Sequence, residues 1–164
     1  MHLTLHTDYA LRVLLYLAHF PDRRINTREI SDSFGISKNH LVRVIKKLEH
    51  HNFVTIALGR NGGLTLAAQP ETIRLSDVIR ACEPNFNVVE CFHLESNTCP
   101  IVPVCGLKAP LQEALNSFLK TLDQYTLADA VQSSTHKRFA KFLLIDPVIE
   151  AGLALVAVHQ PLPK

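Results

Sequence analysis

The stretch Asn26-Thr27-Arg28-Glu29-Ile30-Ser31-Asp32-Ser33-Phe34-Gly35-Ile36-Ser37-Lys38-Asn39-His40-Leu41 decides the fold of this 164-residue chain. Asn26 and Glu29 form a start close to a capping box, which predicts a short helix through Phe34. Gly35 supplies a turn, and Ser37 caps a second helix that runs to about residue 50. Two short helices joined by a glycine turn are the helix-turn-helix pattern. The apolar residues that would join them in one core are Ile30, Phe34, Ile36, Leu41, Val44, Ile45 and Leu48.

The second helix leaves basic and amide side chains on its outer face, and such side chains reach phosphates and base edges in the major groove. Residues 21–64 contain eight Lys/Arg against four Asp/Glu, whereas residues 83–130 contain two against six. This asymmetry predicts a polyanionic partner for the front half alone. A charged helix face is often only a solvated surface, but the turn, the caps and the basic excess together favour DNA. The candidate DNA contacts are Arg12, Arg28, Ser37, Lys38, Asn39, His40, Arg43, Arg60, Asn61 and Gly62.

A β-hairpin is predicted directly after the second helix. Residues 53–56 and 64–66 have the pattern of short strands, and Gly59-Arg60-Asn61-Gly62-Gly63 lies between them. A hairpin in this place is a wing, and Arg60 at its tip is placed to enter a narrow minor groove. The alternative is a plain hairpin with a solvated arginine.

Two further helices are predicted from their caps. Thr7 is the expected cap of a first helix, which places Asp8 in its first turn, where the helix dipole favours a carboxylate. Ser76 is the expected cap of a helix from 77 to about 82. Because Cys82 falls inside that helix, we interpret it as a small buried apolar residue.

Three of the four cysteines lie in Cys91-Phe92-His93-Leu94-Glu95-Ser96-Asn97-Thr98-Cys99-Pro100-Ile101-Val102-Pro103-Val104-Cys105. The two prolines fix φ and remove N–H donors, so this is a stiff loop and not a helix interior. Three thiols on one loop suit a soft metal or an iron–sulfur cluster. A structural zinc site stays open because His93 is near, although the chain has no Cys-x-x-Cys knuckle.

A heptad seam follows the cysteine loop: Leu111, Leu115, Phe118, Leu122 and Tyr125 are spaced 4, 3, 4 and 3. Such a seam pairs two long helices, or it packs within its own chain. A two-fold dimer is favoured, since helix-turn-helix proteins generally read two half-sites with two copies. Residues 126–129 form a capping-box start for a short helix, and the chain beyond Gln132 carries little pattern.

The remaining features exclude other classes of protein. No signal peptide is predicted, and the longest uninterrupted apolar run, residues 151–158, is far too short to span a bilayer. We therefore expect a cytoplasmic protein with reduced thiols, which disfavours disulfides. No nucleophile arrangement or phosphate-binding loop stands out around Cys91 or Cys105, so we do not expect an enzyme.

The chain resembles the winged-helix iron–sulfur transcription regulators, and among them the nitric-oxide-sensing repressors. The resemblance runs from Leu3 to about Val131, some four-fifths of the chain. The segments that carry it are Leu3-Thr4, Thr7-Asp8-Tyr9-Ala10-Leu11-Arg12, Ile36-Ser37-Lys38-Asn39-His40-Leu41-Val42, Gly59-Arg60-Asn61-Gly62-Gly63-Leu64, the three loop cysteines with Pro100, Gly106-Leu107-Lys108, and Tyr125-Thr126-Leu127-Ala128-Asp129.

The resemblance implies a mostly α-helical fold with a small β-wing, and a homodimer that binds a palindromic, A·T-rich DNA operator. It implies one iron–sulfur cluster per subunit, of the 4Fe–4S type in preference to 2Fe–2S. The implied ligands are Cys91, Cys99 and Cys105, with Asp8 from the partner subunit as the fourth. Related 2Fe–2S regulators have a histidine where this chain has Lys108, which is protonated and cannot ligate. The segment between Cys91 and Cys99 is longer than is common in relatives.

These inferences divide the chain into four parts. Residues 1–82 form a winged helix-turn-helix DNA-binding domain, and residues 83–107 form the cluster-binding loop. Residues 108–132 form a dimerisation helix and a short helix, and residues 133–164 form a tail. A sibling regulator that senses iron–sulfur status or oxidants is the main alternative to a nitric oxide sensor.

Overall fold

The computed structural model describes residues 2–93, 95–132 and 136–143. Its front half contains three α-helices, α1 (Leu5–His19), α2 (Thr27–Phe34) and α3 (Lys38–His50), followed by strands β1 (Val54–Ala57) and β2 (Gly63–Leu66). The back half contains α4 (Leu75–Cys82), α5 (Lys108–Leu122), α6 (Leu127–Gln132) and α7 (His136–Phe142). Short 3₁₀ turns lie at Pro70–Thr72, Glu90–Phe92 and Val102–Val104. The predicted fold class, mostly α with a small β-wing, is therefore confirmed.

The helix-turn-helix forms as its local signals predict. The Asn26 side chain accepts a hydrogen bond from the Glu29 amide, and the Ser37 side chain accepts one from the His40 amide. Gly35 ends α2 with a φ of 63°, a left-handed conformation that glycine adopts without strain. The Ser31 hydroxyl donates to the Ile36 carbonyl at 2.6 Å, which closes the turn between α2 and α3.

The wing is an antiparallel pair in which Val54 faces Leu66 and Ala57 faces Gly63, within one residue of the predicted strands. A third segment extends the pairing, since Ile25 exchanges two backbone hydrogen bonds with Leu64, at 3.0 and 2.8 Å. The sequence pattern did not indicate this bridge. It ties the entrance of α2 to the base of the wing.

Two predicted caps are wrong. Thr4, not Thr7, caps α1: its hydroxyl accepts from the Thr7 amide, and Thr7 itself is buried within the first turn of the helix. The N-cap of α4 is Arg74, with no side-chain cap, because the Ser76 hydroxyl is buried and donates instead to the Asp123 carboxylate. The capping box at Thr126 and Asp129 is confirmed by reciprocal hydrogen bonds.

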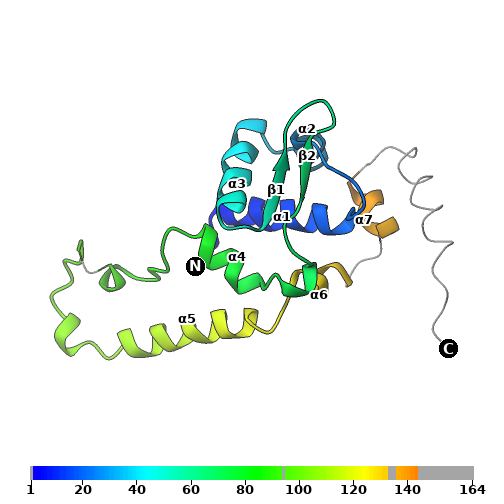
Figure 1. Ribbon diagram of the computed structural model, residues 1–164. Coiled ribbons are helices and arrows are strands. Elements are labelled where there is room, and N and C mark those ends of the chain that lie inside the picture. Colours follow the sequence, from blue (N-terminus) through cyan, green and yellow to red (C-terminus); the bar gives the residue numbers. More distant parts are fainter. Residues whose placement is uncertain (1, 94, 133–135, 144–164) are drawn as a thin grey trace, which may run out of the picture.

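One core joins the front half to α4 and α6. Figure 1 shows α1 crossing beneath α3 and the hairpin, with α4 and α5 on its other side. The largest fully buried side chains of this core are Tyr16, Leu14, Leu17, Ile25, Ile30, Leu41, Leu48, Leu127, His19, Val13, Val44 and Val78. Burial of each such aliphatic side chain contributes about 1.5–3 kcal/mol to folding, so this core positions the helices that carry the site.

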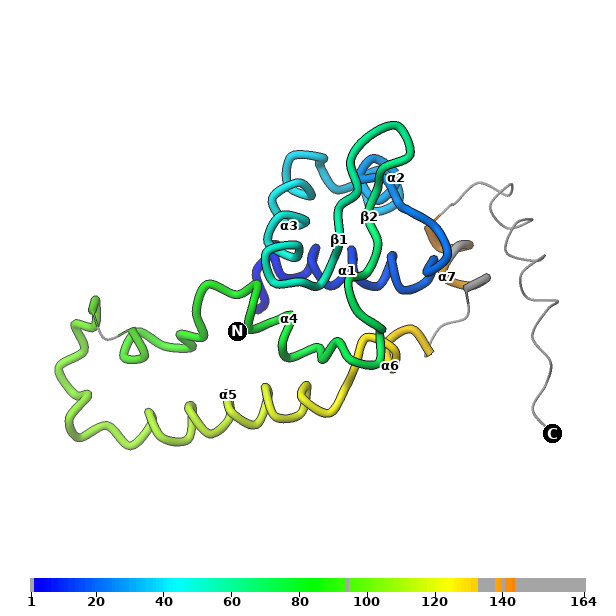
Figure 2. The backbone as a smooth tube through the Cα atoms, viewed as in Figure 1, coloured from blue at the N-terminus to red at the C-terminus, as the bar shows by residue number. Residues whose placement is uncertain are grey.

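The cysteine loop and α5 project from this body. In Figure 2 the backbone leaves the end of α4, runs outward through the loop, and returns along α5 to α6. The arrangement places the loop away from the core, with α5 beside it as a return arm.

Helix α7 lies in the tail, where the sequence carries little pattern. In α7, Phe139 stacks on His19 of α1, with ring centroids 3.7 Å apart and planes at 8°. The chain beyond residue 143 lies outside the described residues. Within the described ranges, no helix is both long and apolar enough to cross a membrane.

Candidate nucleic-acid interface and cysteine loop

The outer face of α3 presents the residues expected to contact DNA. Lys38, Asn39, His40 and Arg43 are all exposed, as is the capping Ser37. Buried Leu41, Val44, Ile45 and Leu48 hold the opposite face of α3 on the core. The helix therefore offers donors and positive charge to solvent over its first two turns, as a recognition helix requires.

The tip of the wing is held by backbone contacts. The Gly62 amide donates to the Gly59 carbonyl at 3.0 Å, and Gly59 has a φ of 99°. Arg60 and Asn61 are exposed between these glycines, and Gly62 is half-buried. The Arg24 guanidinium donates to the Asn61 carbonyl at 3.4 Å. Sequence reasoning missed Arg24, although the Arg23-Arg24 pair before α2 is a local basic signal that could have indicated it.

The two remaining candidate DNA contacts form ion pairs within their own helices. Arg28 is exposed on α2 and lies 3.7 Å from Asp32. Arg12 on α1 makes a two-pronged contact with Asp8, with Nη2 2.6 Å from Oδ2 and Nε 3.2 Å from Oδ1. The Arg12 guanidinium also lies 5.8 Å from the centre of the Tyr9 ring, and that ring stacks on His40 at 6.5 Å. Tyr9, the residue after Asp8, thus connects the Arg12 side chain of α1 with His40 in the first turn of α3.

The four cysteines divide into two environments. Cys82 is buried on α4, and burial raises the pKa of its thiol to about 11. Cys91, Cys99 and Cys105 are free and half-buried on the loop. Cys91 lies in the 3₁₀ turn Glu90–Phe92, and Cys105 follows the turn Val102–Val104. The interpretation of Cys82 as a buried apolar residue fits this position.

The structure does not bring the three loop thiols together. Among the residues it describes, no group of three His, Cys, Asp or Glu side chains is close enough to hold a metal ion. The loop is instead held by its own polar contacts: the Glu90 carboxylate accepts from both the amide and the hydroxyl of Thr98, each at 2.7 Å. These bonds hold the pKa of Glu90 below its ordinary value. They link the neighbour of Cys91 to the neighbour of Cys99.

The chemistry of the donor set fits an iron–sulfur cluster. Three free, partly exposed thiols on one loop are the ligands that such a cluster takes. Asp8 lies in the first turn of α1, where its side chain is 39% exposed and pairs with Arg12, whose side chain is 42% exposed. A carboxylate in that position remains accessible to a second subunit.

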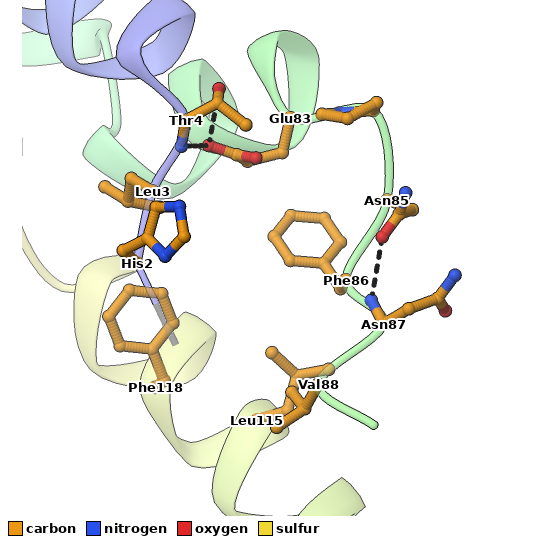
Figure 3. A pocket seen from close by; sticks show the side chains of 11 residues that line it. His2, Leu3, Thr4, Glu83, Asn85, Phe86, Asn87, Val88, Leu115 and Phe118 are labelled. Atoms are coloured by element: carbon orange, nitrogen blue, oxygen red, sulfur yellow. Dashed lines mark hydrogen bonds between the residues drawn. The ribbon is translucent and has the colours of Figure 1, made fainter. Parts of the chain in front are cut away.

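The base of the loop meets the N-terminus of the chain at a cavity of about 370 Å³ (Figure 3). Its apolar walls are contributed by the N-terminal segment, the loop base and α5, through Leu3, Phe86, Val88, Leu115 and Phe118. On its rim the Glu83 carboxylate accepts from the amide of Thr4 at 2.8 Å and from its hydroxyl at 3.2 Å. The start of α1 and the base of the loop are therefore joined at this point by hydrogen bonds as well as by the covalent chain.

A recognition helix with an exposed basic face, a wing beside it and a shared core define a winged helix-turn-helix transcription regulator. Residues 3–133 match the model of the Rrf2 family, described as "Iron-dependent Transcriptional regulator". The HTH-type transcriptional regulator NsrR of Bacillus licheniformis is 48% identical over 139 residues, which cover 84% of this chain and 97% of that protein. NsrR of Bacillus subtilis is 47% identical over 134 residues, 81% of this chain and 92% of that protein. The chain belongs to the Rrf2 family of transcriptional regulators, and to the NsrR group within it.

A solved structure supports the fold independently. The structure of CymR, the global cysteine regulator of B. subtilis, superposes with a TM-score of 0.67 at 20% identity. The match covers 82% of this chain and 98% of that one. At this identity the likeness concerns the arrangement of helices and wing.

Proposed function

We propose that this protein is a cytoplasmic, homodimeric transcriptional repressor whose operator binding is gated by a nitric-oxide-sensitive iron–sulfur cluster. The observation that carries the proposal is the division of the four cysteines. All four are free, but Cys82 is only 6% exposed and lies in the core, whereas the three loop cysteines are half-buried. Packing in the core accounts for Cys82, whereas no packing role accounts for the three loop cysteines, which we therefore assign as ligands.

The ligands we assign are Cys91, Cys99 and Cys105 of one subunit and Asp8 of the other. A bound 4Fe–4S cluster would supply an iron that is open to a small diatomic ligand such as nitric oxide, at the position where Asp8 would be the protein ligand. The role of the chain is to hold Asp8 on the helix that lies behind α3. A ligand on α1 therefore ties the occupancy of the loop to the DNA-binding body.

DNA binding is assigned to α3 and the wing. In the proposed complex, the exposed side chains of α3 enter the major groove of each half-site, and Arg60 enters the minor groove beside it. This arrangement favours a palindromic operator with A·T-rich flanks. A coupling free energy on the order of 1–3 kcal/mol between the loop and the recognition helices gives a 5- to 150-fold change in operator affinity.

The seam of α5 is assigned to the dimer. Leu115 is buried, whereas Leu111, Phe118 and Leu122 are half-buried and Tyr125 is 49% exposed. A heptad seam with this much apolar surface left uncovered suits pairing with a second copy. Sedimentation of the purified protein measures the expected dimer.

The cluster assignment is tested by anaerobic purification and quantification of iron and sulfide. The wild-type protein is expected to be brown, and serine substitution of Cys91, Cys99 or Cys105 is expected to abolish the colour. Cys82→Ala is the matched control, because it removes a thiol that lies in the core. Colourless wild-type protein with stoichiometric zinc would refute the assignment in favour of a structural zinc site.

The sensor assignment is tested on an operator selected from random duplexes. Binding is measured before and after stoichiometric nitric oxide, and separately after oxygen or an iron chelator. Loss of binding at stoichiometric nitric oxide supports the proposal. Unchanged binding with nitric oxide, together with loss after oxygen or chelator, would identify a sensor of oxidants or of iron–sulfur status.

The fourth ligand is tested by Asp8→Ala, which should give a more labile cluster in an intact dimer. Asp32→Ala is the matched control, because Asp32 also pairs with an arginine four residues away on a helix. Arg12→Ala separates the ion pair from ligation: it removes the partner of Asp8 but leaves the carboxylate. Equal cluster stability in Asp8→Ala and Asp32→Ala would exclude Asp8.

A further inference from the structure

The first turn of α1 depends on the conformation of Thr4. The Thr4 hydroxyl accepts from the Thr7 amide at 3.3 Å, and the Thr4 carbonyl accepts from the Asp8 amide at 3.0 Å. Thr4 itself is extended, with φ −62° and ψ 153°, as an N-cap residue is. The orientation of Asp8 is thus set by the residue that precedes the helix.

Thr4 is in turn held by Glu83, which lies 79 positions away in sequence. Glu83 directly follows α4, and its Oε1 atom accepts both from the Thr4 amide at 2.8 Å and from the Thr4 hydroxyl at 3.2 Å. A hydroxyl has one proton to donate, so this donation aims its lone pairs at the Thr7 amide. Hydrogen bonds arranged in such a chain strengthen one another.

Glu83 is also the first residue of the segment that leads to Cys91. Figure 3 shows its carboxylate meeting Thr4 at the rim of the cavity, while Phe86 and Val88 line the wall below. Glu83 is therefore the residue through which the loop segment is hydrogen-bonded to the start of α1. These two hydrogen bonds are half-buried, and they connect the segment that leads to the loop thiols with α1, the helix that carries Asp8.

We propose that Glu83 is a positioning residue for the cluster: its hydrogen bonds to Thr4 fix the first turn of α1 and so hold Asp8 in place as a ligand. The inference rests on the proposed function of Asp8. It adds a connection within each subunit: Glu83 at the base of the cysteine loop holds Asp8 of the same subunit, and Asp8 in turn is offered to the cluster of the other subunit.

The geometry provides a sharp pair of variants. Because Oε1 alone accepts both bonds, Glu83→Gln keeps them through the amide oxygen while removing the charge. Glu83→Ala removes both bonds. If Glu83 acted only by its charge at the N-terminus of α1, the two variants would behave alike. Glu95→Ala, which removes an exposed carboxylate from the same loop, is the control for charge near the thiols.

The first measurement uses the full-length protein without a cluster. Hydrogen exchange at the Thr7 and Asp8 amides should rise roughly tenfold in Glu83→Ala, because both hydrogen bonds that orient Thr4 are lost. Glu83→Gln and Glu95→Ala should exchange like the wild type. Unchanged exchange in Glu83→Ala would overturn the proposal.

The second measurement is the rate at which a chelator bleaches the anaerobically isolated protein, in a double-mutant cycle with Asp8→Ala. Glu83→Ala should speed bleaching in the wild type and add nothing when Asp8 is already alanine. An equal acceleration in both backgrounds would overturn the positioning role of Glu83 but leave Asp8 as a ligand. If Asp8→Ala itself left the bleaching rate unchanged, the proposed ligand would fail, and the positioning role would fail with it.

Discussion

Replacement of Gly62 by alanine should open the tip of the wing. A Cβ at this position would overlap the Ala57 carbonyl oxygen and would lie 2.9 Å from the Gly59 carbonyl oxygen. Both are backbone atoms, one at the end of β1 and one in the turn that follows, so no side-chain rotation relieves the overlap. The Gly62–Gly59 hydrogen bond of 3.0 Å has to break or lengthen.

The cost follows from the kind of contact. Inserting an extra methyl group into occupied space typically destabilises a protein by about 1–3 kcal/mol, and we expect a loss in that range because the overlap is with backbone. The strand pair below the tip should survive, because Val54 and Leu64 are buried in the core. We therefore expect a folded protein whose wing tip, with Arg60, is displaced.

Two assays check this expectation. Urea unfolding of the protein without a cluster should show the loss of stability, and titration of the selected operator should show weaker binding, roughly tenfold for one misplaced arginine contact. Gly106→Ala is the matched control for unfolding, since a Cβ there meets no atom within 4 Å. A Gly62→Ala protein that unfolds and binds like the wild type would refute the close approach of the turn.

Three further outcomes follow from other contacts. Asn26→Ala removes the side chain that caps α2 and should lower the free energy of unfolding by about 1 kcal/mol in urea titrations; no change would show that the cap is dispensable. Hydrogen bonds from Arg80 and then Ser76 hold the pKa of Asp123 at about 2, below its ordinary value. The Asp123 carboxylate therefore adds stability above its unfolded-state pKa, about 4, and this stability is lost as the pH falls toward 2. Asp123→Asn should flatten the dependence of the free energy of unfolding on pH between about 4 and 2. An unaltered pH profile would contradict this. Arg60→Ala should weaken operator binding by about 1 kcal/mol or more, most at A·T-rich flanks, and an equal loss on all flanking sequences in binding titrations would place Arg60 outside the minor groove.

Local chemistry explains which parts of the fold the sequence predicts. The cap at Asn26, the glycine turn and the cap at Ser37 each bond within five residues, so their pattern is readable without knowledge of the tertiary structure. The wing is equally local, because its turn is closed between Gly59 and Gly62. The Ile25–Leu64 bridge escaped prediction because its partners are distant in sequence and neither carries a turn or cap signal.

The two wrong caps have one physical cause. Thr7 and Ser76 are each the hydroxyl residue nearest to the apolar pattern, and local reasoning selects them. In the structure, bonds between distant residues decide otherwise: Glu83 holds Thr4 at the start of α1, and Asp123 takes the Ser76 hydroxyl. Long-range partners that compete for a hydroxyl are invisible to a pattern of neighbours.

The candidate site shows the same limit more strongly. Sequence spacing picks out three loop thiols, but Asp8 is an ordinary first-turn carboxylate until the resemblance singles it out, and its contact in the structure is with Arg12. Of the described residues between 83 and 107, none is buried. Packing therefore supplies little free energy to gather the thiols, in contrast to the core that fixes α3. When the binding of a ligand supplies the free energy that orders a site, the site is rarely preformed. The residue types can therefore predict the chemistry of such a site, whereas its geometry forms only when the ligand binds.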